Sequence, residues 1–252
     1  MGNQSSTLLL APQAHFPHVL SVRYARAHTA TLRLEASFWS HSYPEPLEIR
    51  DVTTNLTMFH IPTTSNHKTH SKRLLDMYNA PVATMTTVER TSRTATTTIT
   101  PAATHHHHGP ERPCCTVETK LLDDYGTLTT QASWGDNTKI TCEGDWSHPH
   151  NISFWLENTQ HHRPERHSHH VHAVRIAHVH SDPAGDDSSD SYLLEIAPGV
   201  DVALILLICA ANDEVMVRHR SHLTGTTSRK RASRMEIAKP PLRQSNALPV
   251  RV

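Results

Sequence analysis

The longest uninterrupted apolar run of the chain lies near its C-terminus. Every side chain from Val202 to Ala211 is apolar, and Pro198-Gly199 supplies a turn signal just before this run. A helix that is apolar on all sides lies either in a membrane or in a protein interior. Its ten residues span about 15 Å, which is half of a hydrocarbon core of about 30 Å. Ala and Leu favour a helix over a buried strand, so Val200–Val217 predicts a helix enclosed by the rest of the chain.

The charges beside this run set the expected limits of the helix. Asp201 lies in the first turn, where the helix dipole favours a negative charge, whereas Asp213 and Glu214 would lie unfavourably at a C-terminus. The helix is therefore expected to continue to about Arg218–Arg220, where cations suit its end. The side chains expected at its core are Val202, Leu204, Ile205, Leu206, Leu207, Ile208 and Cys209.

Short runs of alternating apolar and polar residues precede the helix at intervals of about ten residues, which is typical of an all-β barrel or sandwich. About twelve strands and one apolar helix predict a mainly β (α+β) fold, namely a closed β-barrel that encloses the central hydrophobic C-terminal helix. The expected strands are Thr31–Glu35, Pro46–Arg50, Leu56–Ile61, Lys72–Met77, Val82–Val88, Thr94–Thr100, Thr116–Leu122, Thr127–Ser133, Lys139–Asp145, Ile152–Glu157, Val171–His180 and Tyr192–Ala197.

Composition divides the chain into three parts. Met1–His28 is polar and contains prolines, so it is expected to be a flexible N-terminal segment. Thr29–Val217 carries the core pattern and is expected to form one barrel domain. Arg218–Val252 is polar and basic, and we expect it to be a disordered tail.

Charge and cysteine content limit the expected binding partners and the expected cellular compartment of the protein. Lys plus Arg and Asp plus Glu both number 24, so no overall field attracts nucleic acid, and no nucleic-acid partner is expected. The four cysteines include no C-x-x-C pair, and Cys209 lies within the apolar run, which favours reduced thiols in the cytoplasm. The N-terminal run Leu8–Ala11 is too short for a signal peptide. We expect a monomeric cytoplasmic protein.

Two segments resemble the LURP-one-related family. Tyr192–Val215 is similar to its C-terminal signature, in which a strand leads through a proline/glycine–valine–aspartate turn into an apolar helix, and Lys72–Met85 resembles one of its hairpins. The resemblance covers roughly Ala30–Val217. It implies the tubby C-terminal-like superfamily, with phospholipid scramblases as relatives, and a twelve-stranded barrel around a hydrophobic helix. The basic residues with which tubby proteins bind phosphoinositides match no motif here.

Histidine is unusually frequent, at 23 of 252 residues. Two inserts, His105–His108 and His161–His170, depart from the family pattern. His172, His178 and His180 stand at even spacing, which places them on one face of a strand, where imidazoles are candidate zinc or copper ligands. They are weak candidates, because no cysteine or acidic ligand stands at compact spacing. Biased composition is the favoured interpretation, and no metal or other cofactor is expected.

Catalytic motifs are missing from the sequence. It contains no G-x-S-x-G and no phosphate-binding glycine loop. The paired carboxylates Asp123-Asp124 and Asp186-Asp187 fall in predicted turns, where aspartate hydrogen-bonds the backbone. We therefore expect no catalytic residue and no enzyme.

The two ends of the chain carry candidate membrane signals. The first six residues, MGNQSS, fit the pattern for N-myristoylation at Gly2. A basic cluster of Arg229, Lys230, Arg231 and Arg234 lies near the other end, and Ser233 within it is a candidate phosphorylation site. One acyl chain binds membranes only marginally and needs a second signal such as a polybasic patch.

These features favour a non-enzymatic tubby-like barrel module that binds phosphoinositides or another anionic membrane surface, or a protein partner. One alternative is a scramblase-like activity that moves phospholipids between leaflets, but the length of the apolar helix opposes its entry into lipid. A second alternative is a nuclear regulatory protein that uses the basic cluster for import. The expected location is the cytoplasm, peripheral at a membrane, with the nucleus as the alternative.

Overall fold

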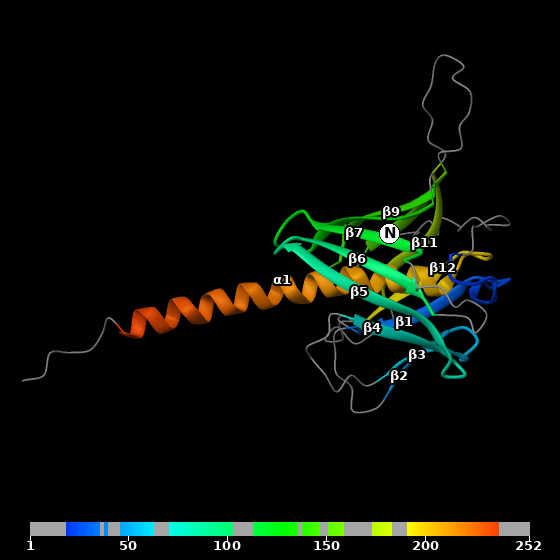
Figure 1. Cartoon of the computed structure of the whole chain (residues 1–252), viewed down its shortest axis with the longest axis horizontal. Helices are drawn as coiled ribbons and strands as arrows, with labels where there is room; N and C mark the ends of the chain where they lie inside the picture. The colour runs from blue at the N-terminus through cyan, green and yellow to red at the C-terminus, as the bar shows by residue number, and fades with distance from the viewer. Residues whose placement is uncertain are drawn as a thin grey trace, which may run out of the picture.

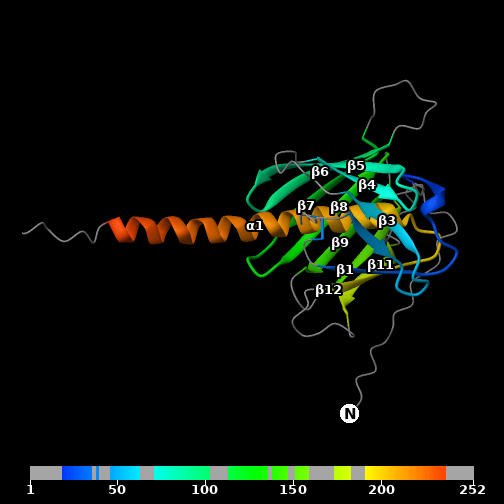
Figure 2. The ribbon, with the colours of Figure 1, turned by 90° about the horizontal axis from the view of Figure 1, so that it is seen from below.

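The computed structural model describes residues 19–35, 38 and 39, 46–62, 71–102, 113–135, 138–146, 151–158, 173–182 and 191–236, with side chains as far as residue 222 near the C-terminal end. In these residues, twelve antiparallel strands curl around one long helix (Figures 1 and 2). The elements are η1 (Val22–Tyr24), β1 (Ala30–Glu35), β2 (Leu47–Arg50), β3 (Thr57–Ile61), β4 (Ser71–Asp76), β5 (Pro81–Thr91), β6 (Thr94–Pro101), β7 (Cys115–Leu121), β8 (Thr127–Trp134), β9 (Thr138–Asp145), β10 (Asn151–Asn158), β11 (Ala173–Ser181), β12 (Ser191–Ile196) and α1 (Val202–Glu236).

The sheet returns on itself to make a barrel. Each strand from β2 to β11 pairs with the next strand along the chain, and β12 pairs with β1, where Ala30 lies opposite Ile196. At the remaining junction, between β1 and β2, the described residues form a single isolated bridge between Leu32 and Asp51. The barrel is therefore nearly closed, with one thin seam in place of two free sheet edges.

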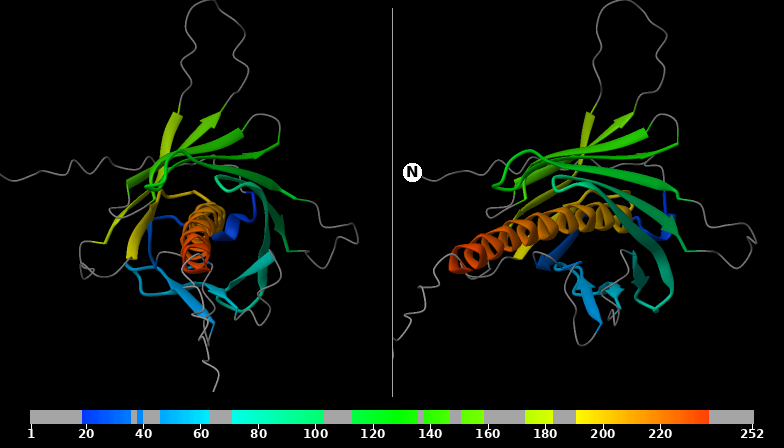
Figure 3. Two further views of the ribbon diagram at one scale, coloured as in Figure 1. Left: turned by 90° about the vertical axis from the view of Figure 1, so that its left-hand side faces the viewer. Right: turned by 60° about the vertical axis from the view of Figure 1, so that its left-hand side comes forward.

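The helix fills the barrel. Side chains of β7 alternate, so that Val117 and Leu121 are buried while Glu118 is exposed. Every side chain of α1 from Leu204 to Ala211 is 0 % exposed, and Figure 3 shows the helix running through the strands. Each buried Leu or Ile contributes about 1.5–3 kcal/mol relative to an exposed one. The predicted fold class is confirmed, and the side chains expected at the core of the helix are buried.

The chain just before β1 is folded, in contrast to the expected flexibility of Met1–His28. Tyr24 is buried, and its ring packs against Phe59 with a centroid separation of 5.6 Å. The carboxylate oxygen Oδ2 of Asp201 accepts hydrogen bonds from the backbone N–H of Leu20 at 2.9 Å and of Ser21 at 3.4 Å. The expectation is wrong for residues 19–28, because these contacts fix them to the start of the helix. Residues 1–18 lie outside the described residues.

Asp201 caps the helix instead of lying in its first turn. The helix begins at Val202, and Oδ1 of Asp201 accepts a hydrogen bond from the backbone N–H of Leu204 at 3.2 Å. This is the arrangement of an N-cap aspartate, which satisfies one of the free N–H groups at a helix start. One buried carboxylate thus joins the helix to the N-terminal segment.

Replacing Asp201 with alanine is expected to lower the free energy of unfolding by about 2 kcal/mol. The substitution removes a helix cap and leaves the N–H groups of Leu20 and Ser21 without this acceptor. Asp201→Asn keeps one acceptor oxygen and should lose about half as much. Urea unfolding of both variants beside the wild type measures the difference. Equal losses would show that the charge matters more than the number of accepted hydrogen bonds.

The helix continues well past its predicted end. It is 35 residues long and ends at Glu236, about 52 Å from its start. The expectation of a disordered tail from Arg218 is therefore wrong as far as Glu236, and the expected end at about Arg218–Arg220 was too early. Once a helix has been nucleated, each further residue adds a hydrogen bond at little additional cost. Residues 237–252 lie outside the described residues.

Candidate functional site

The predicted site residues fall into three groups. Gly2 and His172 lie outside the described residues. His178 and His180 lie together on β11. The basic cluster and the phosphorylation candidate lie on the described backbone of α1, beyond its last described side chain; they are Arg229, Lys230, Arg231, Ser233 and Arg234.

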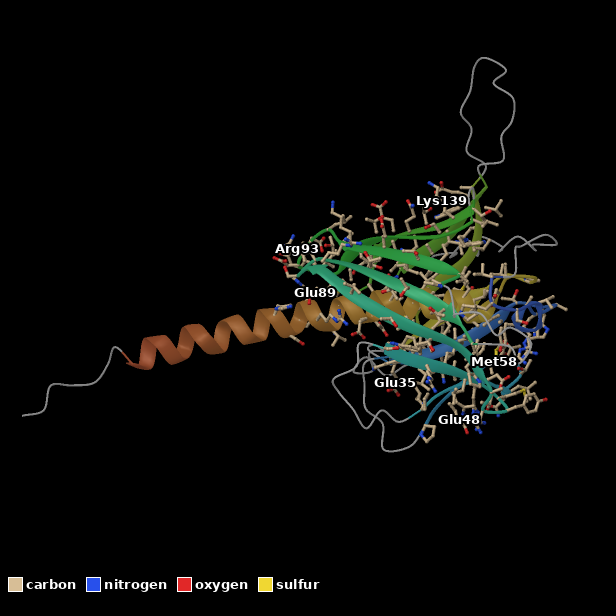
Figure 4. All side chains as sticks on the ribbon, viewed as in Figure 1. Glu35, Glu48, Met58, Glu89, Arg93 and Lys139 are labelled. Atoms are coloured by element: carbon tan, nitrogen blue, oxygen red, sulfur yellow. The ribbon has the colours of Figure 1, made fainter. Side chains whose placement is uncertain are left out.

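The helix leaves the barrel between two turns. Nε2 of His222 in α1 lies 3.2 Å from Oε1 of Glu89, which is near the C-terminal end of β5. Nε2 of His219 lies 3.4 Å from Oδ1 of Asp124, in the turn between β7 and β8. Figure 4 shows Glu89 and Arg93 at this mouth, and Arg93 pairs with Asp124 at 2.5 Å. Two acidic side chains, Glu89 and Asp124, therefore lie beside the exit of the helix.

The helix carries the basic cluster clear of this acidic mouth. At 1.5 Å per residue, Arg229 stands about 10 Å beyond His222 along the helix, and Arg234 about 18 Å. These separations exceed the Debye length of about 8 Å at physiological ionic strength, so the acids at the mouth are largely screened from the cluster. The projecting part of α1 is visible in Figure 1 as the orange to red end of the helix.

A shallow depression lies on the outer face of the barrel near the same mouth. Its volume is about 420 Å³, and its lining includes the cations Arg90 and Lys120, the acid Glu118 and several threonines. Nε of Arg90 donates to Oγ1 of Thr96 at 2.8 Å. Two cations and several hydroxyl groups can hydrogen-bond the oxygens of an anion. Sequence analysis missed this depression because its residues come from different strands.

A buried polar layer crosses the barrel interior where the apolar part of the helix ends. Oδ1 of Asn212 accepts hydrogen bonds from the hydroxyl groups of Thr130 at 2.7 Å and Thr119 at 3.2 Å. Its amide Nδ2 lies 3.8 Å from Sγ of Cys142. All four residues are buried. The layer satisfies polar groups between helix and wall, which is a structural role.

The side chain of Asp213, the residue after Asn212, also contacts the barrel that surrounds the helix. Its Oδ1 accepts a hydrogen bond from Nε1 of Trp146 at 2.7 Å. The ring of Tyr192 packs edge-on against Trp146 at 5.6 Å. Burial, and to a lesser extent the charge of Asp213, raises the pKa of the Tyr192 hydroxyl well above its usual value. Glu214 instead pairs with Arg218 one turn along the helix, at 2.7 Å, so neither acid lies at the helix end.

The surroundings of the cysteine thiols and of Asp123 favour a structural role over a catalytic one. Burial raises the pKa of the thiol of Cys114 to about 11 and that of Cys142 to about 12, so both thiols are protonated at neutral pH. Asp123 accepts hydrogen bonds from the backbone N–H groups of Gly126 and Thr127, both at 2.9 Å. Hydrogen bonding by Thr127 lowers the pKa of Asp123. The predicted role of this aspartate in its turn is confirmed, and Asp186-Asp187 lies outside the described residues.

His178 and His180 share the outer face of β11, as their even spacing predicted. Their rings stack with a centroid separation of 5.4 Å. Burial, followed by the charges of Arg175 and His180, lowers the pKa of His178. Glu195 of β12 completes a group with them, in which potential ligand atoms all lie within 4.8 Å of one another. Sequence analysis missed Glu195, because the register that places it opposite His178 is a property of strand pairing.

Within the residues that the structure describes, no helix combines the length and the apolarity that crossing a membrane requires.

Comparison with known proteins gives one family match. A family model described as LURP-one-related matches residues 24–213, which include the barrel and α1 as far as Asp213. No curated protein matches the chain. A crystal structure of a protein from Arabidopsis thaliana is similar over 78 % of this chain and 97 % of that protein, with 13 % sequence identity and a TM-score of 0.44.

Proposed function

Since the chain belongs to the LURP-one-related family, we propose that it is a non-enzymatic tubby-like barrel module that binds an anionic membrane surface, with phosphoinositides as the preferred lipids. The observation that carries the proposal is the path of α1. The helix leaves the barrel beyond His222 and holds Arg229, Lys230, Arg231 and Arg234 clear of the acidic mouth. A basic segment placed in this way can approach lipid headgroups while the barrel stays in water.

The strength of the proposed attraction follows from the number of charges. Each basic residue near an anionic leaflet contributes about 1 kcal/mol, so the four cations of the cluster contribute about 4 kcal/mol. The depression that contains Arg90 and Lys120 lies at the same end of the barrel and offers further contacts to phosphate oxygens. A myristoyl chain on Gly2 would add a second anchor to the cytoplasmic face of a membrane. Phosphorylation of Ser233 would weaken the attraction, because it adds negative charge to the cluster.

The packing of the helix disfavours the scramblase alternative. Entry of α1 into lipid would require the barrel to release side chains that are now 0 % exposed, from Leu204 to Ala211. The inner faces of the strands would lose their packing at the same time, at a cost of about 1.5–3 kcal/mol for each large apolar side chain.

Neutralising the basic cluster is expected to weaken membrane binding about 100-fold. In the variant Lys230→Gln, Arg231→Gln, Arg234→Gln, three attractions of about 1 kcal/mol each are lost. Flotation of the full chain with vesicles of phosphatidylcholine alone, with added phosphatidylserine and with added phosphatidylinositol bisphosphate measures the partition coefficient. In cells, Gly2→Ala should shift the protein from the membrane fraction to the soluble fraction, and the combined variant should shift it further.

The matched control removes three cations from barrel strands by Arg33→Gln, Arg50→Gln and Arg73→Gln, and it should float almost as well as the wild type. Equal flotation of the cluster variant and the wild type would overturn the membrane proposal. Cluster-dependent accumulation in the nucleus without flotation would favour the import alternative. Equal membrane fractions for the wild type and Gly2→Ala would exclude the acyl anchor but leave the role of the basic cluster intact. A leaflet-dye bleaching assay tests scramblase activity separately.

A further inference from the structure

Two histidines and a glutamate form a compact cluster on the outer face of the barrel. His178 and His180 belong to β11, and Glu195 of β12 lies opposite His178 in the strand register. One potential ligand atom from each residue lies within 4.8 Å of the other two, and all three residues are partly buried. The cluster is separate from the basic cluster of α1 and from the depression near the mouth of the barrel.

His180 is oriented as a metal ligand. Its Nδ1 lies 3.0 Å from the backbone carbonyl oxygen of Ser181, which can only accept a hydrogen bond. Nδ1 therefore carries a proton, and in the neutral ring Nε2 presents its lone pair. Metal-binding histidines are commonly fixed by a hydrogen bond of this kind from the second ring nitrogen.

The lone pair of His180 faces a carboxylate. Nε2 of His180 lies 3.4 Å from Oε1 of Glu195. Two acceptor atoms in this position attract a cation between them. In a tetrahedral zinc site with bonds of about 2.0–2.1 Å, neighbouring ligand atoms are about 3.4 Å apart, so this pair already has the required spacing.

His178 supplies the third donor. Its Nε2 lies 3.2 Å from Oδ1 of Asn151 on β10, a contact that holds the ring in place beside that of His180. A proton shared between two acceptor atoms would use only His180 and Glu195. A metal ion can bind His178, His180 and Glu195 at the same time. The nearby cation Arg175 opposes metal binding, whereas the negative charge of Glu195 favours it.

We propose that His178, His180 and Glu195 form a zinc-binding site that joins β11 to β12, with water in the fourth position. Two imidazoles and one carboxylate are a known donor set for zinc, and this set leaves one coordination position open. The bound ion would connect neighbouring strands just before the chain enters α1. This site is independent of the proposed membrane function.

Zinc binding to the full chain can be measured by competition with a chromophoric chelator. The wild type is expected to bind one Zn²⁺ ion more tightly than any further Zn²⁺ ion. The double variant His178→Gln, His180→Gln should lose this tight site, so that its highest zinc affinity falls at least about 100-fold. Glu195→Gln should also bind more weakly, and Asn151→Ala, which removes an orienting contact, should lose about tenfold. Co²⁺ should give the visible absorption of a tetrahedral site in the wild type but not in the double variant.

The controls separate this site from the general metal affinity of a histidine-rich chain. His60→Gln removes a histidine from β3 and should leave the tight site unchanged. A variant in which His161, His162, His167, His169 and His170 are all changed to Gln should keep the tight site and lose weaker ones. Equal zinc affinity in the wild type and the His178→Gln, His180→Gln variant, with circular dichroism showing that both are folded, would overturn the proposal. So would loss of the tight site in the insert variant alone.

Discussion

Leu206→Ala is expected to lower the free energy of unfolding by about 4 kcal/mol, which for a domain of this size lowers Tm by about 10 °C. Leu206 is 0 % exposed within α1 and is surrounded by the barrel. The cost is high for a leucine because the strands around it are hydrogen-bonded to one another and cannot collapse into the cavity. Urea unfolding followed by circular dichroism measures the loss.

The same substitution at an exposed position is the matched control. Leu56 is 53 % exposed, so Leu56→Ala should change the free energy of unfolding by about 0.5 kcal/mol or less. A similar small loss for Leu206→Ala would mean that the helix does not fill the barrel in solution. A large loss at both positions would point to an effect on the unfolded chain.

Gly144→Ala is expected to cost about 4 kcal/mol, and the variant is expected to accumulate poorly in soluble form. Gly144 lies in β9 opposite Ile152 of β10, with φ at +155°. A Cβ atom there would overlap the backbone oxygen of Asn151 and stand 3.0 Å from Cγ1 of Ile152. The clash is with the backbone of a paired strand, so no side-chain rotation relieves it. Thermal unfolding of the purified variant measures the loss.

Gly135→Ala is the control for backbone conformation alone. Gly135 has φ at +61°, and a Cβ atom there would meet nothing within 4 Å. Its substitution should cost about 1–2 kcal/mol, the strain of a left-handed residue without a clash. If Gly144→Ala lost no more than Gly135→Ala, β9 and β10 would have to be farther apart than the structure places them.

The fold could be predicted from the sequence, because the two strongest signals in the chain are local patterns. Alternation and turn signals located eleven of the twelve strands, and the threonine-rich stretch Thr94–Thr100, where the pattern is weak, was a further candidate that proves to be β6. The uniformly apolar run from Val202 to Ala211 required an enclosure. The limits of the helix were harder to predict. Its start depends on Asp201, whose carboxylate also binds residues 180 positions away in the chain, and no local pattern reports such a contact.

The candidate sites could be predicted only in part, for a related reason. Even spacing placed His178 and His180 on one face, but Glu195 joins them through the pairing of β11 with β12. Thr119 and Thr130 are two of many threonines in the strands, and Asn212 directly follows an apolar run. Their hydrogen bonds follow from the depth at which the helix lies in the barrel. Register and depth are set by the whole sheet.

The chain order of the barrel has a consequence for its synthesis. β1 is made early, yet its partner β12 and the residues that fill the interior are made late: Ala30 pairs with Ile196, and the enclosed run ends at Ala211. At about 5–20 residues per second, a ribosome takes roughly 10–40 s to pass from Ala30 to Ala211. During that interval the inner faces of the strands have no core to cover them. The barrel can therefore close only after its last element has been made, and until then the exposed apolar faces of the strands make the nascent chain prone to aggregation.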